Sequence, residues 1–388
     1  MTNELLIGVI GAGGRGAVAH YAHNPQDGVR LVAGADTDPA ALERFRGVLG
    51  ADTFVTADYR ELLARPEIGA VFVATPDHLH EEHAVAALKA GKHVYLEKPM
   101  AITVTGCDRI LRTAMECGRR LYVGHNMRHM TVIQKMKEII DSGRIGEVKA
   151  GWCRHFIAYG GDAYFKDWHA DRARSTSLLL QKGAHDIDIL HWLCGGFSRR
   201  VTAVGGLTVY DRITDRHDPS ERGFAGWSDA NWPPLSQTGL NPVMDVEDIS
   251  MMLMELDNGV FASYQQCHYT PDAWRNYTVI GTEGRIENLG DNPGECMVAL
   301  WNKRGAYKPQ GDEQFPIAAV GGSHGGADPA IVAEFVRFAR EGGATTTSPI
   351  AARNSVAAGY CAAHSLRNGS VPVDVPPVDA KVAEYFAG

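Results

Sequence analysis

The stretch that decides the fold is Leu5-Leu6-Ile7-Gly8-Val9-Ile10-Gly11-Ala12-Gly13-Gly14-Arg15-Gly16, near the start of the chain. It joins an apolar run of strand length to a glycine-rich turn, and a second apolar run over 29–35 ends at Asp36. A strand, a glycine turn, a helix, a second strand and a carboxylate, in this order, are typical of a dinucleotide-binding unit. A glycine pattern alone also occurs in ordinary turns, but the strand before it and the acid after it favour the binding unit.

The glycines of this turn have separate physical roles. Gly11 allows the tight turn, Gly13 lets the backbone approach a pyrophosphate, and Gly16 lets the following helix pack close to the strand. The N-terminus of that helix favours an anion through its free amides and its dipole. We therefore expect this turn, with Gly14, to contact the pyrophosphate of the cofactor.

The choice between NAD and NADP depends on Asp36. Its carboxylate is expected to accept hydrogen bonds from the adenosine ribose hydroxyls and to repel a 2′-phosphate, which favours NAD. Arg15 argues against this preference, because its side chain could reach such a phosphate. Arg15 and Thr37 complete the expected cofactor contacts of this unit.

Composition bounds the class of protein. The chain has 388 residues, of which 45% are hydrophobic and 22% charged, as is ordinary for a globular protein of two or three domains. Its formal net charge of -8 argues against a nucleic-acid partner. The first strand leaves no room for a signal peptide, and no apolar stretch is long enough to span a membrane. The seven cysteines are scattered without a CxxC pair, which indicates free thiols in a reducing cytoplasm.

The pattern of the chain changes near residue 125. Before it, apolar runs of strand length alternate with helical patterns, which predicts a parallel sheet over residues 1–125. After it, a helix over 183–194 and strand-like runs joined by hairpin turns predict a second domain, 126–388, with a mostly antiparallel sheet and helices on one face. The polar segment 211–245 is rich in Gly, Pro and Trp, so we expect an inserted loop that acts as a lid or an oligomer contact. Helices over 328–340 and 349–366 are expected to close the fold.

Five motifs in this order resemble the glucose–fructose oxidoreductase / inositol dehydrogenase / MocA family over nearly the whole chain. They are Gly11-Ala12-Gly13-Gly14-Arg15-Gly16, Ala74-Thr75-Pro76-Asp77-His78-Leu79-His80, Gly91-Lys92-His93-Val94-Tyr95-Leu96-Glu97-Lys98-Pro99, Gly124-His125-Asn126-Met127-Arg128 and His185-Asp186-Ile187-Asp188. The resemblance implies an NAD(P)-binding Rossmann domain and a second α/β domain whose open sheet often forms the oligomer contact. It further implies hydride transfer at a ring carbon of a sugar or cyclitol, and a homodimer or homotetramer.

The resemblance also assigns roles to matching positions. Lys98 would hydrogen-bond the reacting hydroxyl and relay its proton, and His185 would be the acid/base or the substrate-orienting residue. The residues expected along the cofactor are Thr75, Pro76, His80, Glu97, Lys98 and Asn126, with Trp168 and Arg172 towards the nicotinamide end.

The chemistry of the reaction agrees with these roles. Oxidation of an alcohol releases a hydride and a proton, so a base must lie near the hydroxyl. Lys98 follows a buried strand and can act as that base if burial lowers its pKa; the alternative is a surface lysine paired with Glu97. His185 opens an apolar helix, where a structural cap is the alternative.

One position departs from the family pattern. Many dehydrogenases of the family carry Asp four residues before the histidine, and this chain has Gln181, which cannot take a proton. Lys182 would share a helix face with His185 and is a candidate second base or anion contact. The alternative is a solvated lysine at a helix start.

The segment 159–174 is aromatic and cationic, which suits a sugar that bears an acid group. Its candidate substrate contacts are Tyr159, Lys166, Trp168, Arg172 and Arg174, and a solvated loop with local salt bridges is the alternative. His324 is a further substrate candidate, with a helix-entry turn as the alternative. His78, His80 and His83 lack cysteine partners, so we expect no metal site.

Three functions compete at this point. The first is an NAD-dependent dehydrogenase of a sugar, sugar acid or cyclitol. The second is a redox-neutral, NAD⁺-dependent glycoside hydrolase that oxidises carbon 3, eliminates the aglycone, adds water and returns the hydride, for example on a uronide or sulfosugar glycoside. Lys182, with Tyr159 or Tyr164, supplies the spare bases that this second cycle needs. The third is a non-catalytic NAD sensor, against which Lys98 and His185 argue.

Overall fold

The computed structural model describes residues 4–218, 226–321 and 324–387, and its contacts divide the chain into two compact units. Unit 1 comprises Met1–His129, Gly321–Arg353 and Val378–Gly388, and unit 2 comprises Met130–Val320 and Asn354–Pro377. We expected all of 126–388 to form the second domain. The chain instead returns to unit 1 twice, because helix α10 (Ala327–Glu341) contributes to the core of that unit.

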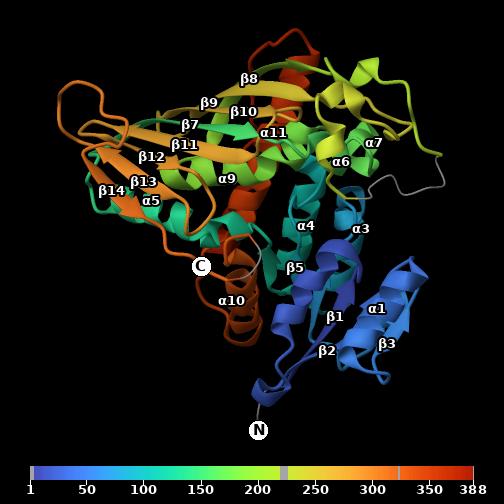
Figure 1. The fold of residues 1–388 in the computed structure, drawn as a ribbon. Coiled ribbons are helices and arrows are strands. Elements are labelled where there is room, and N and C mark those ends of the chain that lie inside the picture. The colour runs from blue at the N-terminus through green and yellow to red at the C-terminus, as the bar shows by residue number, and fades with distance from the viewer. Residues whose placement is uncertain (1–3, 219–225, 322–323, 388) are drawn as a thin grey trace. The chain divides into compact units, whose positions relative to one another are not determined.

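Unit 1 is built on a parallel sheet of six strands in the order β3-β2-β1-β4-β5-β6 (Figure 1). The strands are β1 (Leu5–Ile10), β2 (Val29–Ala35), β3 (Phe54–Thr56), β4 (Ala70–Val73), β5 (His93–Leu96) and β6 (Leu121–Val123). The central strands β1 and β4 are buried on both faces, which explains their almost unbroken apolar sequences. Because all six strands are parallel, their carboxyl ends meet at one edge of the sheet, where ligands bind in folds of this class.

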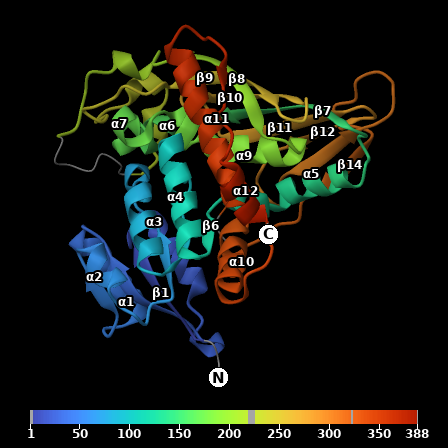
Figure 2. The same cartoon turned by 180° about the vertical axis from the view of Figure 1, so that it is seen from behind.

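The helices of unit 1 begin at side-chain caps. Asp38, Asp58 and Thr103 each accept a backbone amide at the start of α1 (Pro39–Leu49), α2 (Tyr59–Leu63) and α4 (Val104–Cys117). Helix α3 (His80–Lys89) lies beside α4, as the reverse view shows (Figure 2). The remaining elements are the 3-10 segments η1 (Gly14–Ala22), η2 (Pro25–Asp27), η3 (Asp77–Leu79) and η4 (Asn126–His129), and helix α12 (Ala380–Ala387).

Aromatic packing ties α10 to the sheet of unit 1. Phe335 of α10 meets Phe72 edge-on with ring centroids 5.1 Å apart and Tyr95 at 5.4 Å. Phe72 in turn stacks on Tyr95 at 4.5 Å. These rings are buried, and aromatic pairs of this kind add to the area burial that stabilises a core.

Unit 2 contains a sheet of nine strands in the order β14-β13-β12-β11-β7-β10-β9-β8-β15. The ladder between β7 (Val148–Phe156) and β10 (Phe261–Cys267) is parallel, and the other ladders are antiparallel, so the prediction of a mostly antiparallel sheet is confirmed. The other strands are β8 (Ser198–Gly206), β9 (Ile249–Leu256), β11 (Trp274–Gly281), β12 (Arg285–Leu289), β13 (Met297–Trp301), β14 (Glu313–Pro316) and β15 (Val373–Asp374).

Helices cover one face of this sheet. Helix α9 (Gly183–Cys194) packs on β7 and β10, and α5 (Thr131–Asp141) packs on α9 and on the β12–β13 hairpin (Figure 1). Helix α9 ends where the sequence predicts, because Gly195 takes the left-handed conformation with φ of 70°. The short helices α6 (Gly160–Ala163), η5 (Trp168–Ala170), α7 (Arg172–Ser175) and α8 (Leu178–Gln181) precede it, and α11 (Pro349–Arg367) follows late in the chain.

The described parts of the segment 211–245, namely 211–218 and 226–245, lie between β8 and β9 and contain no strand or α-helix; residues 219–225 lie outside the described part. The segment contains the 3-10 segments η6 (Tyr210–Arg212, at its start), η7 (Asp229–Asn231) and η8 (Pro234–Ser236). Its Ile213 and Leu240 share a small apolar core with Phe165 and Leu178. The insertion is therefore packed against the 159–178 segment of unit 2.

No helix among the described residues is long and apolar enough to cross a bilayer. The seven cysteines are free thiols, five of them buried.

Candidate functional site

The glycine turn of unit 1 has the close approaches that its sequence predicts. A Cβ atom on Gly11, whose φ is +85°, would lie 2.7 Å from the Ala74 carbonyl oxygen, and one on Gly16 would lie 1.9 Å from the Gly11 carbonyl oxygen. Gly14 also has positive φ, +46°, yet a Cβ there would meet nothing within 4 Å. The turn is thus tightly packed below and open at Gly14, where a pyrophosphate would approach. The segment after it, η1, is a 3-10 helix rather than an α-helix.

Asp36 is held in a fixed orientation beside this turn. Its Oδ2 accepts the Gly13 amide at 2.9 Å, and its Oδ1 accepts the Asp38 amide at 2.9 Å. Each carboxylate oxygen has a second lone pair, so both remain able to accept a ribose hydroxyl. Asp36 is half-buried and Thr37 beside it is exposed.

Arg15 does not have the position from which it would bind a 2′-phosphate. Its Nη1 and Nη2 donate to the two oxygens of Asp328 at 2.7 and 2.8 Å, and its Nε donates to Glu97 at 2.8 Å. Burial lowers the pKa of Arg15, but the charges of Glu97 and Asp328 outweigh it and raise the pKa above its usual value. Arg15 is therefore a tether between the turn and two acids, which removes the argument for NADP.

The turns after β4 and β5 are joined through a buried histidine. His80 bridges the Thr75 carbonyl at 2.8 Å and the Pro99 carbonyl at 2.7 Å with its two ring nitrogens. His83 contacts the Thr75 hydroxyl at 3.0 Å. Because both ring nitrogens of His80 are engaged by backbone, its role here is to position the Thr75-Pro76 turn and the turn that carries Lys98.

Lys98 follows β5 at the carboxyl edge of the sheet. Its amide donates to Oε2 of Glu97 at 3.1 Å, and Glu97 is 4% exposed while Lys98 is half-buried. Glu97 binds Arg15 with Oε1, so its carboxylate fixes the backbone of Lys98 and the glycine turn at once.

Asp328 contacts two further residues that the sequence analysis singled out, Asn126 and His324. It accepts Nδ2 of Asn126 at 2.8 Å and contacts Nδ1 of His324 at 2.9 Å. Asn126 is 1% exposed, and its Oδ1 has no hydrogen-bond partner among the described residues. An orphaned buried acceptor needs a donor, and the carboxamide of a nicotinamide is one. The turn, Asp36 and Asn126 therefore fit a nicotinamide dinucleotide. His324 is placed on the Asp328 cluster, with its side chain 49% exposed.

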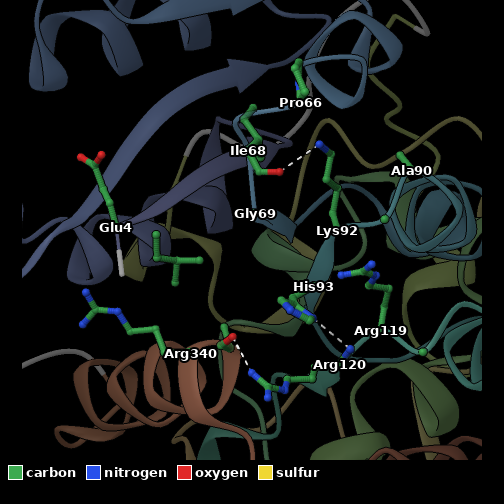
Figure 3. Close-up of a pocket in the computed structure, with 14 residues that line it drawn as sticks. Glu4, Pro66, Ile68, Gly69, Ala90, Lys92, His93, Arg119, Arg120 and Arg340 are labelled. Atoms are coloured by element: carbon green, nitrogen blue, oxygen red, sulfur yellow. Dashed lines mark hydrogen bonds between the residues drawn. The ribbon is translucent and has the colours of Figure 1, made fainter. Parts of the chain in front are cut away.

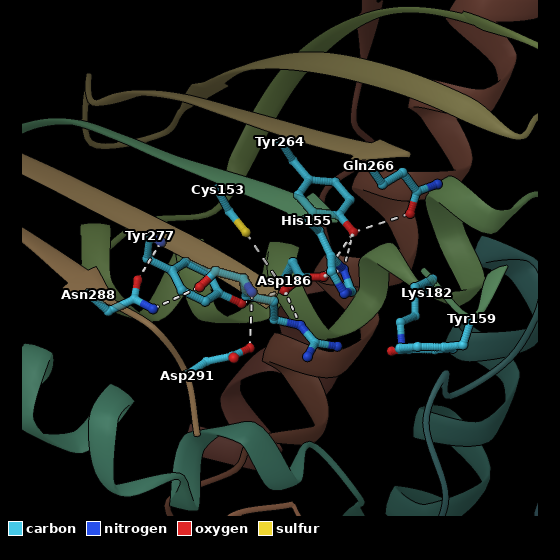
Figure 4. Close-up of polar contacts among 11 residues, drawn as sticks. Cys153, His155, Tyr159, Lys182, Asp186, Tyr264, Gln266, Tyr277, Asn288 and Asp291 are labelled. Atoms are coloured by element: carbon cyan, nitrogen blue, oxygen red, sulfur yellow. Dashed lines mark hydrogen bonds and ion pairs between the residues drawn. The ribbon is translucent and has the colours of Figure 1, made fainter. Parts of the chain in front are cut away.

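In unit 2, two rows of side chains cross three adjacent strands on the side that faces α9. Gln266, His155 and Arg275 are opposite one another on β10, β7 and β11, and Tyr264, Cys153 and Tyr277 form the row two residues away. These rows surround Asp186 of α9, which Figure 4 shows between Tyr277 and His155. This cluster is the part of the site that the sequence analysis missed.

Asp186 is completely buried and saturated with donors. Oδ2 accepts the Tyr264 hydroxyl at 2.8 Å and contacts Nδ1 of His155 at 3.0 Å, and Oδ1 accepts Nε of Arg275 at 2.9 Å and the Tyr277 hydroxyl. Burial raises the pKa of Asp186, but Arg275 and His155 outweigh it and hold the pKa well below its usual range. Burial, then the charge of Arg275, lowers the pKa of His155 to about 3, so its ring is neutral.

Lys182 lies beside this cluster, immediately before α9. Its Nζ donates to the Tyr159 hydroxyl at 3.3 Å and lies 5.4 Å from the ring centres of both Tyr159 and Tyr164 (Figure 4). Burial, then the charge of Arg275, lowers the pKa of Lys182 to about 7, with Asp186 opposing the shift. Lys182 is 8% exposed, so it is not the solvated lysine that was the alternative.

His185 and Gln181 flank Lys182 and are also buried, at 7% and 5% exposure. His185 lies in the first turn of α9, and Gln181 ends α8. His268, which the sequence analysis did not single out, is 0% exposed, and neither of its ring nitrogens has a partner among the described residues. Burial lowers its pKa well below the usual value, with the charges of His155 and Lys182 acting in the same direction.

The cations of the 159–174 segment are paired with acids. Lys166 contacts Asp162 at 3.2 Å, Arg174 contacts Asp171 at 3.4 Å, and Nε of Arg172 lies 3.6 Å from Oδ2 of Asp245. The side chains of Arg172 and Arg174 are about half exposed, 49% and 53%. Trp168 stacks on His169 with ring centroids 3.8 Å apart. Local salt bridges therefore explain the cations of this segment as fully as binding of an acidic sugar would.

A cavity of about 710 Å³ lies in unit 1 at the amino ends of the strands, the edge opposite to Lys98 (Figure 3). Lys92 on its wall donates to the carbonyls of Arg65 and Ile68 at 2.7 and 2.9 Å, and Arg120 donates to the Ala339 carbonyl at 2.7 Å. None of the site residues expected from the sequence lines it. The described residues contain no group of three or more potential metal ligands.

Two family models match the chain. The GFO/IDH/MocA oxidoreductase family with its NAD-binding Rossmann fold matches residues 5–125, and the GFO/IDH/MocA C-terminal domain matches residues 133–287. Together these segments span well over half of the chain.

Three curated relatives illustrate the range of the similarity. Inositol 2-dehydrogenase of Pseudomonas fluorescens is 36% identical over 193 residues, 49% of this chain and 54% of the relative. Levoglucosan dehydrogenase of Pseudarthrobacter phenanthrenivorans is 27% identical over 317 residues, 76% of each chain. A 2,7-anhydro-N-acetylneuraminate hydratase of Mediterraneibacter gnavus is 32% identical over 204 residues, 52% of each. The chain spans about half the length of the first and third of these relatives.

The fold also matches a solved structure over its full length. Levoglucosan dehydrogenase in complex with NADH and L-sorbose superposes with a TM-score of 0.78 and 24% identity, over 97% of this chain and 100% of that one. At this identity the likeness shows the fold.

Proposed function

Since this chain belongs to the Gfo/Idh/MocA family of oxidoreductases with an NAD-binding Rossmann fold, we propose that it moves a hydride between NAD and a ring carbon of a sugar, sugar acid or cyclitol. The observation that carries the proposal is the position of Lys98 directly after β5, on the sheet edge that also presents the glycine turn and Asp36. The similarity to inositol and levoglucosan dehydrogenases supports a cyclic polyol as the substrate.

The proposed chemistry divides between the two units. NAD supplies the hydride acceptor or donor when it is bound. The turn residues Gly11, Gly13 and Gly14 and the carboxylate of Asp36 hold its pyrophosphate and ribose, and Asn126 accepts from the carboxamide. Lys98 takes the proton of the hydroxyl that is oxidised and returns it in the reverse direction, and His185 orients that hydroxyl or exchanges the proton.

The test is one reaction mixture with two readouts. Purified protein is incubated with NAD⁺ and a panel of free sugars, cyclitols and aryl glycosides, including anionic ones. NADH that forms in proportion to the sugar establishes the dehydrogenase. A panel that gives neither NADH nor free aglycone contradicts the proposal.

A second function is supported by Lys182. A redox-neutral glycosidase oxidises carbon 3, and the resulting ketone acidifies the hydrogen on carbon 2. A second base removes this proton, the aglycone leaves carbon 1 with the electron pair, water adds, and the hydride returns. Lys182, with a pKa lowered to about 7 and 3.3 Å from Tyr159, is suited to that second proton transfer. The hydratase among the relatives, whose name describes no net redox change, supports this alternative.

This alternative has its own signature. It predicts that aglycone is released with a catalytic amount of NAD⁺ and without accumulating NADH. In deuterated water, carbon 2 of the sugar product acquires deuterium, and Lys182→Met slows this exchange more than it slows oxidation at carbon 3. Equal slowing of both steps would exclude Lys182 as the second base.

The oligomer that we expect is a homodimer or homotetramer in the cytoplasm. Its proposed contact is the face of the unit 2 sheet away from α9, where large apolar side chains are exposed: Val204 51%, Met251 42%, Leu253 65% and Phe261 65%. Light scattering after gel filtration should give a dimer or tetramer mass, and Leu253→Lys should lower it. A monomer for the unmodified protein would contradict this contact.

A further inference from the structure

We propose that Arg275 recognises an anionic substituent, a carboxylate or a sulfonate, on the sugar that enters the site of unit 2. This inference rests on the proposed function and names the substrate class more narrowly. It assigns recognition of the anion to Arg275 and not to the 159–174 segment, whose cations already have acidic partners.

The first observation is the orientation of the Arg275 guanidinium. Its Nε is used by Asp186 at 2.9 Å, and its backbone amide donates to Asp291 at 2.9 Å. Neither terminal nitrogen has a hydrogen-bond partner among the described residues. The Arg275 side chain is 15% exposed, whereas Asp186 is 0% exposed. The terminal nitrogens present a planar pair of donors, the geometry that binds two oxygens of a carboxylate or sulfonate.

The second observation is the neighbourhood into which these donors point. Arg275 is directly opposite His155 across the β7–β11 ladder, on the side that faces Asp186. Lys182 and Tyr159, which are 3.3 Å apart, lie on the His155 side of Asp186 (Figure 4), and the charge of Arg275 lowers the pKa of Lys182. A sugar that is bound at the Lys182–Tyr159 pair would therefore have a substituent close to Arg275.

The third observation is the repulsion between two buried cations. The charge of Arg275 is the second cause, after burial, of the lowered pKa of Lys182. Asp186 offsets only part of this repulsion, because the pKa of Lys182 remains lowered to about 7 with the carboxylate in place. An anion on the terminal nitrogens of Arg275 would offset the repulsion, whereas a neutral hydroxyl would not. The site therefore favours an acidic sugar over its neutral counterpart.

The experiment compares matched substrates. The kcat/KM is measured for an aryl glucuronide, an aryl 6-sulfonate glucoside and the neutral aryl glucoside with the same aglycone. Arg275→Lys keeps the positive charge beside Asp186 but loses the planar fork. We expect it to lower the anionic-to-neutral ratio of kcat/KM by about 10-fold or more, because charge-assisted hydrogen bonds contribute about 1.5–3 kcal/mol. The matched control is Arg200→Lys, an exposed arginine paired with Asp374 at 2.7 Å on β8, which should leave the ratio unchanged.

Two further readouts separate recognition from structure. The inflection that Lys182 gives to the pH profile of kcat, which reports the enzyme–substrate complex, should lie higher for the glucuronide than for the glucoside. Glucuronate and glucose 6-sulfonate should raise the melting temperature of the NAD-bound protein more than glucose does, and Arg275→Lys should abolish the difference. If glucuronate and glucose 6-sulfonate raise the melting temperature equally, Arg275 recognises the negative charge that they share. If one raises it more, that anionic group, carboxylate or sulfonate, is the preferred ligand.

The outcomes are distinguishable from failure of the proposed function. Turnover of neutral and anionic sugars with the same kcat/KM, or an equal loss for both in Arg275→Lys, would overturn the inference while the oxidoreductase assignment stands. Absence of turnover for every sugar, with the anion-specific rise in melting temperature intact, would overturn the proposed function and retain the inference.

Discussion

Two buried aspartates, Asp328 in unit 1 and Asp186 in unit 2, each stand at the centre of a polar cluster that contains an arginine. The clusters differ in whether the arginine keeps unpaired donors. All three side-chain nitrogens of Arg15 donate to Asp328 or Glu97, so this cluster holds the glycine turn in place and has no arginine donor left for a ligand. Arg275 spends one side-chain nitrogen on Asp186, and the buried Lys182 beside it has a pKa lowered to about 7.

This comparison separates positioning from chemistry. An arginine whose donors are all paired, such as Arg15, holds the backbone and side chains around it in place. An arginine with unpaired donors, such as Arg275, can bind a ligand, and a lysine with a pKa near neutral pH, such as Lys182, can exchange a proton with it. In the proposed function, the unit 1 cluster positions Lys98 and the residues expected to contact the cofactor. The unit 2 cluster supplies the groups proposed to bind the substrate and exchange protons with it.

The largest expected effect concerns Lys98, the lysine that we propose as the catalytic base. Lys98→Met should lower kcat/KM by about 1,000-fold, since general acid–base catalysis contributes about 10²–10⁴-fold. The dissociation constant for NAD, measured by fluorescence quenching, should change little because Glu97 and the turn are intact. Turnover that survives this substitution would remove Lys98 from the mechanism.

The next effect is on stability, and it compares the two aspartates. Asp186→Asn should lower the free energy of unfolding by about 3–5 kcal/mol, because it leaves the buried Arg275 without its counter-charge. Asp328→Asn should lower it by less, because Arg15 is 32% exposed and keeps its ion pair with Glu97. Chemical denaturation measures the loss. We expect Asp328→Asn also to weaken NAD binding, since Arg15 and Asn126 lose their shared acceptor. If Asp186→Asn weakens NAD binding equally, the division of roles is wrong.

A pH-dependent difference is expected at Lys182. Its pKa is about 7 in the folded protein and 10.5 ordinarily, so between these values the unfolded chain binds a proton that the folded chain does not. The free energy of unfolding of the unmodified protein, relative to Lys182→Met, should therefore rise with pH from about 7 towards 10, by at most about 1.4 kcal/mol per pH unit. Parallel stability curves for the two proteins would show that Lys182 is not a depressed lysine.

The smallest effect concerns cofactor choice. Asp36→Ala should shift the ratio of kcat/KM for NAD and NADP by about 10-fold towards NADP, because it removes the ribose acceptor and its charge, a loss of roughly 1.5–3 kcal/mol for hydrogen bonds to a charged group. Arg15→Ala should leave that ratio unchanged, since Arg15 faces Asp328. A ratio that responds to Arg15 and not to Asp36 would reverse the assignment.

Local patterns predicted much of the fold. The β1–turn–η1 unit, the end of β2 at Asp36 and the span of α9 with its Gly195 terminus follow from short-range periodicity and glycine conformation. The strands β12 to β14 were missed because they are short and amphipathic, and their pairing depends on neighbours in the sheet. The return of α10 to unit 1 depends on Phe335 packing against Phe72, a contact that no local pattern encodes.

The candidate site divides in the same way. Lys98, His185, Lys182 and the glycines were identified because they occur in contiguous motifs. Arg275, His155 and Tyr264 were missed because the register of three strands brings them to Asp186 from positions far apart in sequence. The available signal was Asp186 itself, an acid on the apolar helix 183–194, which requires buried partners. The ion pair of Arg15 with Asp328 was not foreseen, because the two residues are 313 positions apart in the sequence.

The most direct test of the central claim is a single-turnover experiment in rapid mixing. Protein saturated with NAD⁺ is mixed with the best sugar or glycoside of the panel, and the NADH absorbance is followed together with product. The account predicts that NADH forms in the first turnover, and then either accumulates or decays as the hydride returns. Product formation with no NADH signal at any time, in a reaction that still requires Lys98, would contradict it.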